Sequence, residues 1–160
     1  MKTNVIGPVH LAVMTHNLSD LAQALSQGES VDELDHEGRT PLFYAVRDGD
    51  LALVSDLIQH GANPDARDKS LWSPLHFAAQ GYWSEVAELL LKHGANVDAR
   101  DNNGNTPLWR AVFASRGRGD VIKVLLSAGA DRKLKNNHNV SPLDLANTIA
   151  THDMKPFLAD

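Results

Sequence analysis

The chain has 160 residues, of which 42% are hydrophobic and 22% charged, and its formal net charge is −5. This composition is typical of a folded domain with a sizeable core. Because there is no cysteine, disulfide bonds, thiolate catalysis and cysteine-ligated zinc are excluded. No segment approaches the roughly 18 apolar residues of a membrane span, and the first residues lack a sustained apolar run, so we expect a cytoplasmic protein without a membrane partner.

Charge is unevenly distributed along the chain. Residues 1–109 carry 7 basic and 15 acidic side chains, whereas residues 110–135 carry 7 basic and 2 acidic ones. A long acidic portion disfavours sequence-independent binding of nucleic acid, which requires positive charge over a large face. We therefore expect no nucleic-acid partner, but the basic segment keeps this question open.

A sequence pattern recurs every 33 residues. A hydroxyl residue followed by Pro-Leu stands at Thr40, Ser73 and Thr106. The same step carries the pattern back to Pro8 and, with two extra residues, forward to Ser141. Five copies therefore fill the chain, over approximately residues 1–34, 35–67, 68–100, 101–135 and 136–160.

Each copy predicts two short helices. The first begins at the hydroxyl residue, which can cap a free backbone N–H, and continues with proline, which suits the first helical position. The second is an apolar stretch that stops at Gly28, Gly61, Gly94 or Gly129, which fit the left-handed position after a helix. Helices of roughly 8 to 11 residues are marginal alone in water, so the copies must stack and bury their apolar faces on one another.

This pattern resembles the ankyrin repeat, whose motif reads about D-x-x-G-x-T-P-L-H-x-A-A, followed by a second helix and G-A-D/N. The match is clearest in residues 68–100, where Ser73-Pro-Leu-His-Phe-Ala-Ala79 precedes Leu89-Leu-Leu-Lys-His-Gly-Ala-Asn96. The resemblance implies an all-α solenoid of about five stacked helix-turn-helix repeats. It also implies short β-hairpin or turn fingers along one edge, with the first and last copies acting as caps.

Some copies depart from the motif. Its histidine position is occupied by His10, Phe43, His76, Trp109 and Asp144. Only His76 keeps the usual pairing with a hydroxyl residue, and Gly7 stands where the first copy should have one. Leu71 replaces the glycine of the finger turn in the third copy. These departures leave the finger geometry of the middle copies open.

The two extra residues of the fourth copy fall within Ser115-Arg-Gly-Arg-Gly119, between its two helices. Arg118-Gly119-Asp120 is a triplet typical of cell-adhesion ligands. We expect Asp120 instead to begin the second helix, where free N–H groups and the helix dipole favour a carboxylate. A solvated loop and a partner-contacting loop both fit the exposed arginines of this joint.

The resemblance implies that another protein binds to the finger tips and to the exposed side of the first helices. By motif position, the predicted partner-binding residues are His36, Glu37, Arg39, Arg47, Asp48, Lys69, Ser70, Trp72, Gln80, Asn103, Asn105, Phe113, Arg116 and Arg118. Trp72 is the sharpest candidate, because a finger tryptophan is expected to be largely exposed and exposed aromatic residues often anchor interfaces. The alternative is that Trp72 packs on its own finger. For Tyr82 and Trp83 we expect packing across adjacent turns.

No cofactor, metal or catalytic site is predicted. His60 and His93 end the second helices of neighbouring copies, about 8 to 10 Å apart, whereas zinc ligands each lie about 2 Å from the metal. Placement at helix ends therefore explains them better. The chain has no phosphate-binding loop, H-E-x-x-H or G-x-S-x-G motif. We expect a protein that is not an enzyme.

Two functions follow from the resemblance. The first is a module that binds and occludes one protein partner, as do small bacterial ankyrin proteins that serve as immunity proteins against a cognate toxin. The acidic first two thirds favour a basic partner, such as a nuclease. The second is an adaptor, scaffold or effector that links two cellular proteins, with the acidic fingers and residues 110–135 as separate surfaces. We expect a monomer in the free state.

Overall fold

The computed structural model of the protein describes residues 6–149 and 155–158. Ten helices make up this part of the chain, and no β-strand occurs within it. In chain order they are α1 (Pro8–Met14), α2 (Leu18–Ser26), α3 (Pro41–Asp48), α4 (Leu51–Gln59), α5 (Pro74–Gly81), α6 (Ser84–Lys92), α7 (Pro107–Ala114), α8 (Asp120–Ser127), α9 (Pro142–Thr148) and α10 (Lys155–Leu158).

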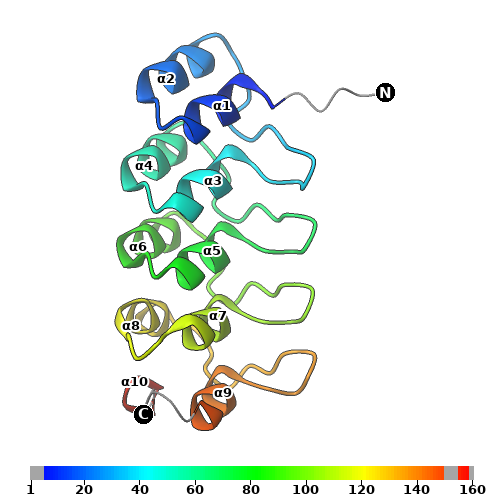
Figure 1. Ribbon diagram of the computed structural model, residues 1–160, viewed down its shortest axis with the longest axis vertical. Helices are drawn as coiled ribbons and strands as arrows, with labels where there is room; N and C mark the ends of the chain where they lie inside the picture. Colours follow the sequence, from blue (N-terminus) through cyan, green and yellow to red (C-terminus); the bar gives the residue numbers. More distant parts are fainter. Residues whose placement is uncertain (1–5, 150–154, 159–160) are drawn as a thin grey trace.

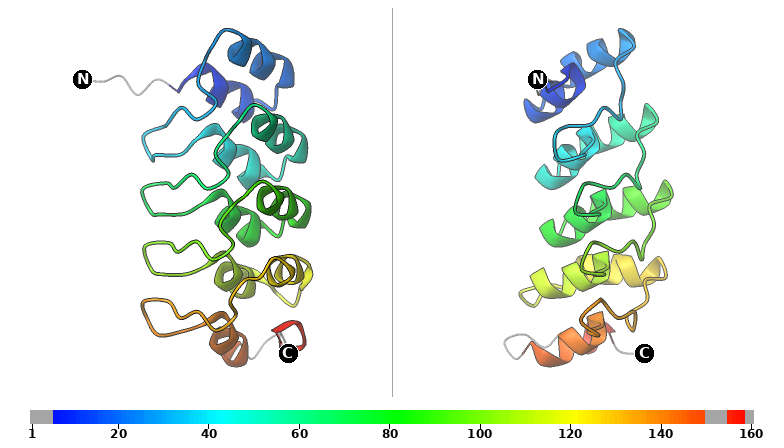
Figure 2. Two further views of the ribbon diagram at one scale, coloured as in Figure 1. Left: turned by 180° about the vertical axis from the view of Figure 1, so that it is seen from behind. Right: turned by 90° about the vertical axis from the view of Figure 1, so that its right-hand side faces the viewer.

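The helices form pairs that stack in one column (Figure 1). The odd-numbered helices from α1 to α9 form one row, and the even-numbered helices α2, α4, α6 and α8 form a second row. Long hairpin-like fingers project beyond the first row. Seen from behind and from the side, the rows stay in register along the column (Figure 2). The predicted all-α solenoid of stacked helix pairs is therefore confirmed.

Hydroxyl residues precede the first helix of each copy from the second onward, as predicted. The Thr106 hydroxyl accepts a hydrogen bond from the Trp109 N–H at 3.2 Å, and the Ser141 hydroxyl accepts one from the Asp144 N–H at 3.1 Å. The capping prediction is wrong at Thr40, whose hydroxyl is buried without a hydrogen-bond partner.

The core runs along the column between the two rows of helices. Leu42, Leu75 and Leu108 recur at the step of 33 residues, and all three are fully buried. In the second row, Leu57 and Leu90 are fully buried as well. Because each copy buries its leucines against the next, the column has one continuous core, as a stacked repeat protein requires.

The fingers are held by one polar side chain at the base of each. The Oδ1 atom of Asp68 accepts hydrogen bonds from the backbone N–H groups of Ser70 and Trp72, at 2.8 and 2.9 Å. The same arrangement occurs at Asp35, Asp101 and Asn136. Neighbouring fingers are joined by single backbone hydrogen bonds, which are Lys69 to Glu37, Asn102 to Ser70 and Asn137 to Asn103. The fingers therefore form a connected layer.

Leu71 does not change the geometry of its finger. Its φ is 58°, and the glycines at the same position of the neighbouring fingers, Gly38 and Gly104, both have φ of 75°. All three N–H groups donate to the carbonyl at the base of their finger. A leucine thus occupies a left-handed conformation that favours glycine, which costs about 1 to 2 kcal/mol.

The joint of the fourth copy lies where the spacing predicts it. Helix α7 ends at Ala114, α8 begins at Asp120, and Arg116 in the joint has φ of 47°. The ring of Phe157 from α10 lies against Gly119, where a Cβ atom would come within 2.2 Å of it. The widened joint therefore gives the α10 ring a place to pack.

Candidate functional site

One face of the column, formed by the fingers and the odd-numbered helices, carries most of the predicted partner-binding residues. Within it, aromatic and arginine side chains from three copies contact one another in a row that we call the aromatic–arginine stripe. The stripe consists of Arg39, Trp72, Phe77, Trp109, Arg110 and Phe113.

Trp72 lies at the centre of the stripe and is only partly exposed. Its ring meets the Phe77 ring edge-on, with centroids 4.9 Å apart, and the His76 ring at 5.7 Å. The Arg110 guanidinium lies over it at 4.3 Å, within the range of a cation–π interaction. The expectation of a largely exposed Trp72 is therefore wrong, because this side chain packs on α5 and α7 rather than projecting from its finger.

Two arginines of the stripe are positioned by buried carboxylates at the finger bases. The Arg110 Nη2 donates to Asp101 Oδ2 at 2.5 Å, and the Arg39 Nε donates to Asp68 Oδ2 at 3.3 Å. The carboxylates are 0% and 3% exposed, whereas the arginines are 17% and 31% exposed. What this part of the surface presents to solvent is therefore cationic and aromatic.

The Asp101 carboxylate stays charged in this setting. Burial acts to raise its pKa, but hydrogen bonds from Arg110 and from the backbone of Asn105 and Asn103 outweigh burial. The pKa of Asp101 consequently lies below its ordinary value of 3.8. An ionised Asp101 holds the Arg110 guanidinium in one orientation over the Trp72 ring.

Phe113 is the most exposed member of the stripe. Its ring stacks on the Trp109 ring, with centroids 5.4 Å apart and an interplanar angle of 13°, and the residue is 63% exposed. One ring face is thus supported and the rest of the side chain meets solvent. Exposed, rigidly supported aromatic rings are typical anchors of protein interfaces.

Several predicted contact residues lie on this face but make mainly local contacts. Arg47 donates to both oxygens of Asp48 and lies over the Tyr44 ring at 5.0 Å. His36 pairs with Glu37 at 3.3 Å near a finger tip. The other exposed candidates on this face are Lys69, Ser70, Gln80 and Asn103.

Asn105 is not available to a partner, which corrects its assignment as a contact residue. It is 4% exposed, and its Oδ1 accepts a hydrogen bond from Asn136 Nδ2 at 2.7 Å. Its carbonyl accepts from His76 Nε2 at 3.0 Å. Asn105 therefore links three copies from the inside of the finger layer.

Arg116 and Arg118 are both exposed in the joint, and Arg118 packs against Tyr82. Its guanidinium lies 4.1 Å from the Tyr82 ring centroid, and its carbonyl is 2.9 Å from the Tyr82 hydroxyl. Burial raises the pKa of Tyr82 to about 12, so this hydroxyl stays protonated and able to donate. The Trp83 Nε1 donates to the Arg47 carbonyl at 3.3 Å, so Tyr82 and Trp83 both reach a neighbouring copy, as expected.

A partly buried pair within the first copy, which the sequence reasoning missed, positions the His10 ring that links the first two copies. The His10 Nδ1 is 2.9 Å from Glu33 Oε1, which also accepts from the His10 backbone N–H, and the His10 Nε2 is 3.1 Å from the Arg39 carbonyl. A Cβ atom on Gly7 would come within 1.8 Å of Glu33 Oε2. The glycine that replaces the hydroxyl residue therefore makes room for a carboxylate. The only signal in the sequence is Gly7 three positions before His10.

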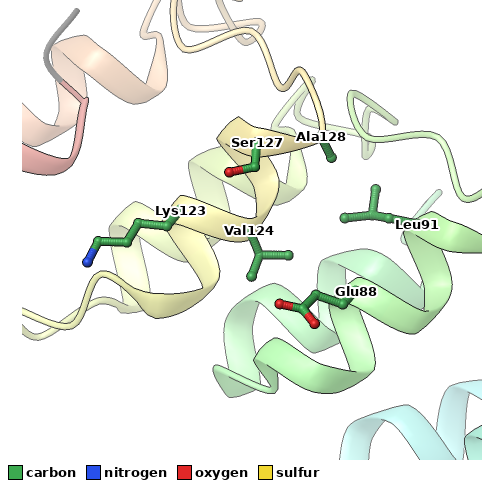
Figure 3. Close-up of a pocket in the computed structure, with 6 residues that line it drawn as sticks. All are labelled: Glu88, Leu91, Lys123, Val124, Ser127 and Ala128. Atoms are coloured by element: carbon green, nitrogen blue, oxygen red, sulfur yellow. The ribbon is translucent and has the colours of Figure 1, made fainter.

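A second surface feature is a groove of about 440 Å³ between α6 and α8, in the other row of helices. In Figure 3, Leu91 and Val124 face one another across it, with Glu88 and Lys123 towards one end and Ser127 and Ala128 towards the other. Ala128 stands at the position where the preceding copy has His93. A small side chain therefore lines this end of the groove.

Neither metal binding nor membrane insertion finds support in residues 6–149 and 155–158. No three acidic or histidine side chains there gather closely enough to hold a metal ion. His60 and His93 each place Nδ1 2.9 Å from a carbonyl of their own helix end. None of the described helices is long and apolar enough to cross a membrane.

Comparison with known proteins identifies the family. A family model described as ankyrin repeats in three copies matches residues 9–101 and again residues 44–136, and together these matches span most of the chain. A comparison with curated proteins finds no match. The chain belongs to the ankyrin-repeat family, whose members are typically non-enzymatic protein–protein interaction modules.

Proposed function

We propose that this chain binds one protein partner on the aromatic–arginine stripe and occludes the partner surface that it covers. The observation that carries the proposal is Phe113, an aromatic ring that is 63% exposed and supported by a stacked Trp109. Elsewhere in the stripe, Trp72 and two arginines are fixed in place by packing and by buried carboxylates. Fixed side chains lose little conformational entropy on binding, which favours affinity. The proposal includes no catalytic step.

Neutralisation of a basic toxin, as by an immunity protein, is one form of this occlusion. It is supported only by the net charge of −5 and by the excess of acidic residues before residue 110. Exposed acidic residues such as Glu85 and Glu88 lie on α6, in the other row of helices. A basic partner would therefore be attracted over a distance to the column as a whole, rather than held by the stripe.

The alternative is an adaptor that binds a second protein elsewhere. The apolar groove between α6 and α8 and the exposed Arg116 in the joint favour this reading, since both lie outside the stripe. An adaptor requires that the two surfaces can be disabled one at a time.

Capture of tagged protein from a lysate of the native cells tests these readings. Wild type is compared with Phe113→Ala, which removes an exposed ring, and with Lys92→Gln, an exposed substitution on the other row of helices. The proposal expects one partner that wild type and Lys92→Gln retain and Phe113→Ala loses. Several partners, all held equally by Phe113→Ala, would contradict it and favour the adaptor.

A further inference from the structure

We propose that the stripe recognises an acidic segment of its partner, in which an Asp or Glu carboxylate pairs with Arg110 and a neighbouring apolar side chain packs on Phe113, while Arg39 offers a further acidic residue a second guanidinium. This inference rests on the proposed function and adds the chemistry of the segment that is bound. Its basis is the set of groups that the stripe presents to solvent.

The two stripe arginines expose positive charge to solvent. The acidic partners of the two stripe arginines, Asp68 and Asp101, are 3% and 0% exposed, so an approaching segment does not meet them. It meets the guanidinium groups of Arg39 and Arg110, which are 31% and 17% exposed. A carboxylate is complementary to this surface, whereas a lysine or arginine of the partner would meet like charge.

Both guanidinium groups keep hydrogen-bond donors that the buried carboxylates do not use. A guanidinium carries five N–H donors. Arg110 donates to Asp101 through Nη2, and Arg39 donates to Asp68 through Nε and lies beside the Tyr44 hydroxyl. The Nε of Arg110 is itself buried without a partner, so the donors left for an incoming acceptor are the remaining Nη hydrogens of Arg110 and the Nη groups of Arg39. Because the buried carboxylates already orient the guanidinium planes, a second carboxylate finds the donors in place.

The rings beside the guanidinium groups favour a segment that also carries an apolar side chain. Each guanidinium lies over a ring, with Arg39 5.5 Å from the Phe77 centroid and Arg110 4.3 Å from the Trp72 centroid. The Phe113 ring, stacked at 5.4 Å on Trp109, offers an apolar platform beside Arg110. A bare carboxylate would leave this platform exposed to water. The segment that fits best places an aromatic or aliphatic side chain next to its acidic one.

Selection from a phage-displayed library of random 12-residue peptides tests the inference on the full chain. We expect the selected peptides to share an Asp or Glu beside a large apolar residue. Each selected peptide is then synthesised together with its Asp→Asn or Glu→Gln form, and both are titrated while tryptophan fluorescence is recorded. Trp72 and Trp109 lie in the stripe and report binding.

The amide form of the peptide should bind at least about tenfold more weakly, because a hydrogen bond from arginine to a charged carboxylate stabilises the complex more than one to a neutral amide. This comparison leaves the protein unchanged, so a folding defect cannot explain it. Arg39→Lys and Arg110→Lys keep the charge beside Asp68 and Asp101 but lose the planar fork, and at least one should shrink the difference between the two peptide forms. Lys92→Gln, which removes a positive charge in the other row of helices, should leave the difference intact.

The outcomes separate this inference from the proposed function. Peptides that lack an acidic residue, or that bind equally well as amides, yet lose affinity for Phe113→Ala would overturn the acidic-segment inference and leave the stripe as the binding surface. If no selected peptide binds Phe113→Ala more weakly than wild type, both ideas fail.

Discussion

Two kinds of junction join neighbouring copies of this protein. Between α1 and α3, and between α5 and α7, a buried histidine reaches a backbone carbonyl of the next finger, at 3.1 Å for His10 and 3.0 Å for His76. Between α3 and α5, and between α7 and α9, the same position holds Phe43 and Trp109. The Thr40 hydroxyl and the Trp109 Nε1 are there buried without hydrogen-bond partners.

An aromatic residue in place of the motif histidine makes different contacts. A histidine uses its polar atoms to fasten copies together, and its ring is hidden. Phe43 meets Phe77 edge-on at 5.6 Å, and Trp109 supports Phe113 and lies 5.6 Å from the Arg110 guanidinium. The aromatic junctions give up hydrogen bonds and support Phe77 and Phe113 of the stripe, whereas the His76 ring keeps its hydrogen bonds and also contacts Trp72. The departures from the repeat motif therefore coincide with the candidate binding surface.

Removal of a histidine junction should cause the largest loss of stability. His76→Ala leaves a cavity at a residue that is 0% exposed and removes the partners of the Ser73 N–H and the Asn105 carbonyl. We expect the free energy of unfolding to fall by roughly 3 to 5 kcal/mol. Urea unfolding followed by circular dichroism measures it, with the exposed His93→Ala as control at under about 1 kcal/mol. Equal losses for the two variants would show that the junction is not fastened by this ring.

The histidine junction should also make stability depend on pH. Burial lowers the pKa of His76 from 6.5 to about 4, so the folded protein keeps this ring neutral while the unfolded chain takes up a proton. The contribution of the neutral His76 ring to the free energy of unfolding is complete above pH 6.5. It is lost as the pH falls towards 4, by up to roughly 3 kcal/mol. Urea unfolding of wild type and His76→Gln at several pH values isolates this effect. The difference in free energy of unfolding between the two proteins should narrow from pH 7 to pH 4. A constant difference would contradict the lowered pKa of His76.

A smaller effect should distinguish the two hydroxyl residues of these junctions. The Ser73 hydroxyl lies 2.8 Å from His76 Nδ1, whereas the Thr40 hydroxyl is buried without a hydrogen-bond partner. Ser73→Ala should cost about 1 kcal/mol, and Thr40→Val should be neutral or should stabilise by up to about 1 kcal/mol, because it removes an unpaired buried group. Thermal or urea unfolding of the pair checks this. Similar losses of unfolding free energy at both positions would mean that the Thr40 hydroxyl forms a hydrogen bond in solution.

The smallest expected effect concerns Leu71, in the finger of the third copy. Leu71 has φ of 58°, which glycine adopts without the steric cost that a leucine bears. We expect Leu71→Gly to raise the free energy of unfolding by about 0.5 to 1 kcal/mol, which a urea midpoint detects. Gly38→Ala, with φ of 75° and room for a methyl group, should lose a similar amount. A loss on Leu71→Gly would show that the leucine side chain holds the finger.

Spacing predicted the repeat fold well, because helix starts, glycine stops and buried leucines all recur at one step of 33 residues. The same spacing located the joint of the fourth copy before Asp120. It could not predict the contacts of Trp72, since the rings and the guanidinium around it come from two different copies. Nor could it predict Glu33 beside Gly7, because that contact depends on how the chain returns after α2.

The central claim is that the stripe built on the aromatic junctions is the binding surface. Its most direct test is the affinity of the purified partner for wild type and Phe113→Ala, measured by titration calorimetry with the unfolding of both proteins in parallel. We predict that binding weakens by at least about 2 kcal/mol, as for an interface anchor, while stability changes by less than about 1 kcal/mol. Unchanged affinity would contradict the claim and place the partner elsewhere on the column.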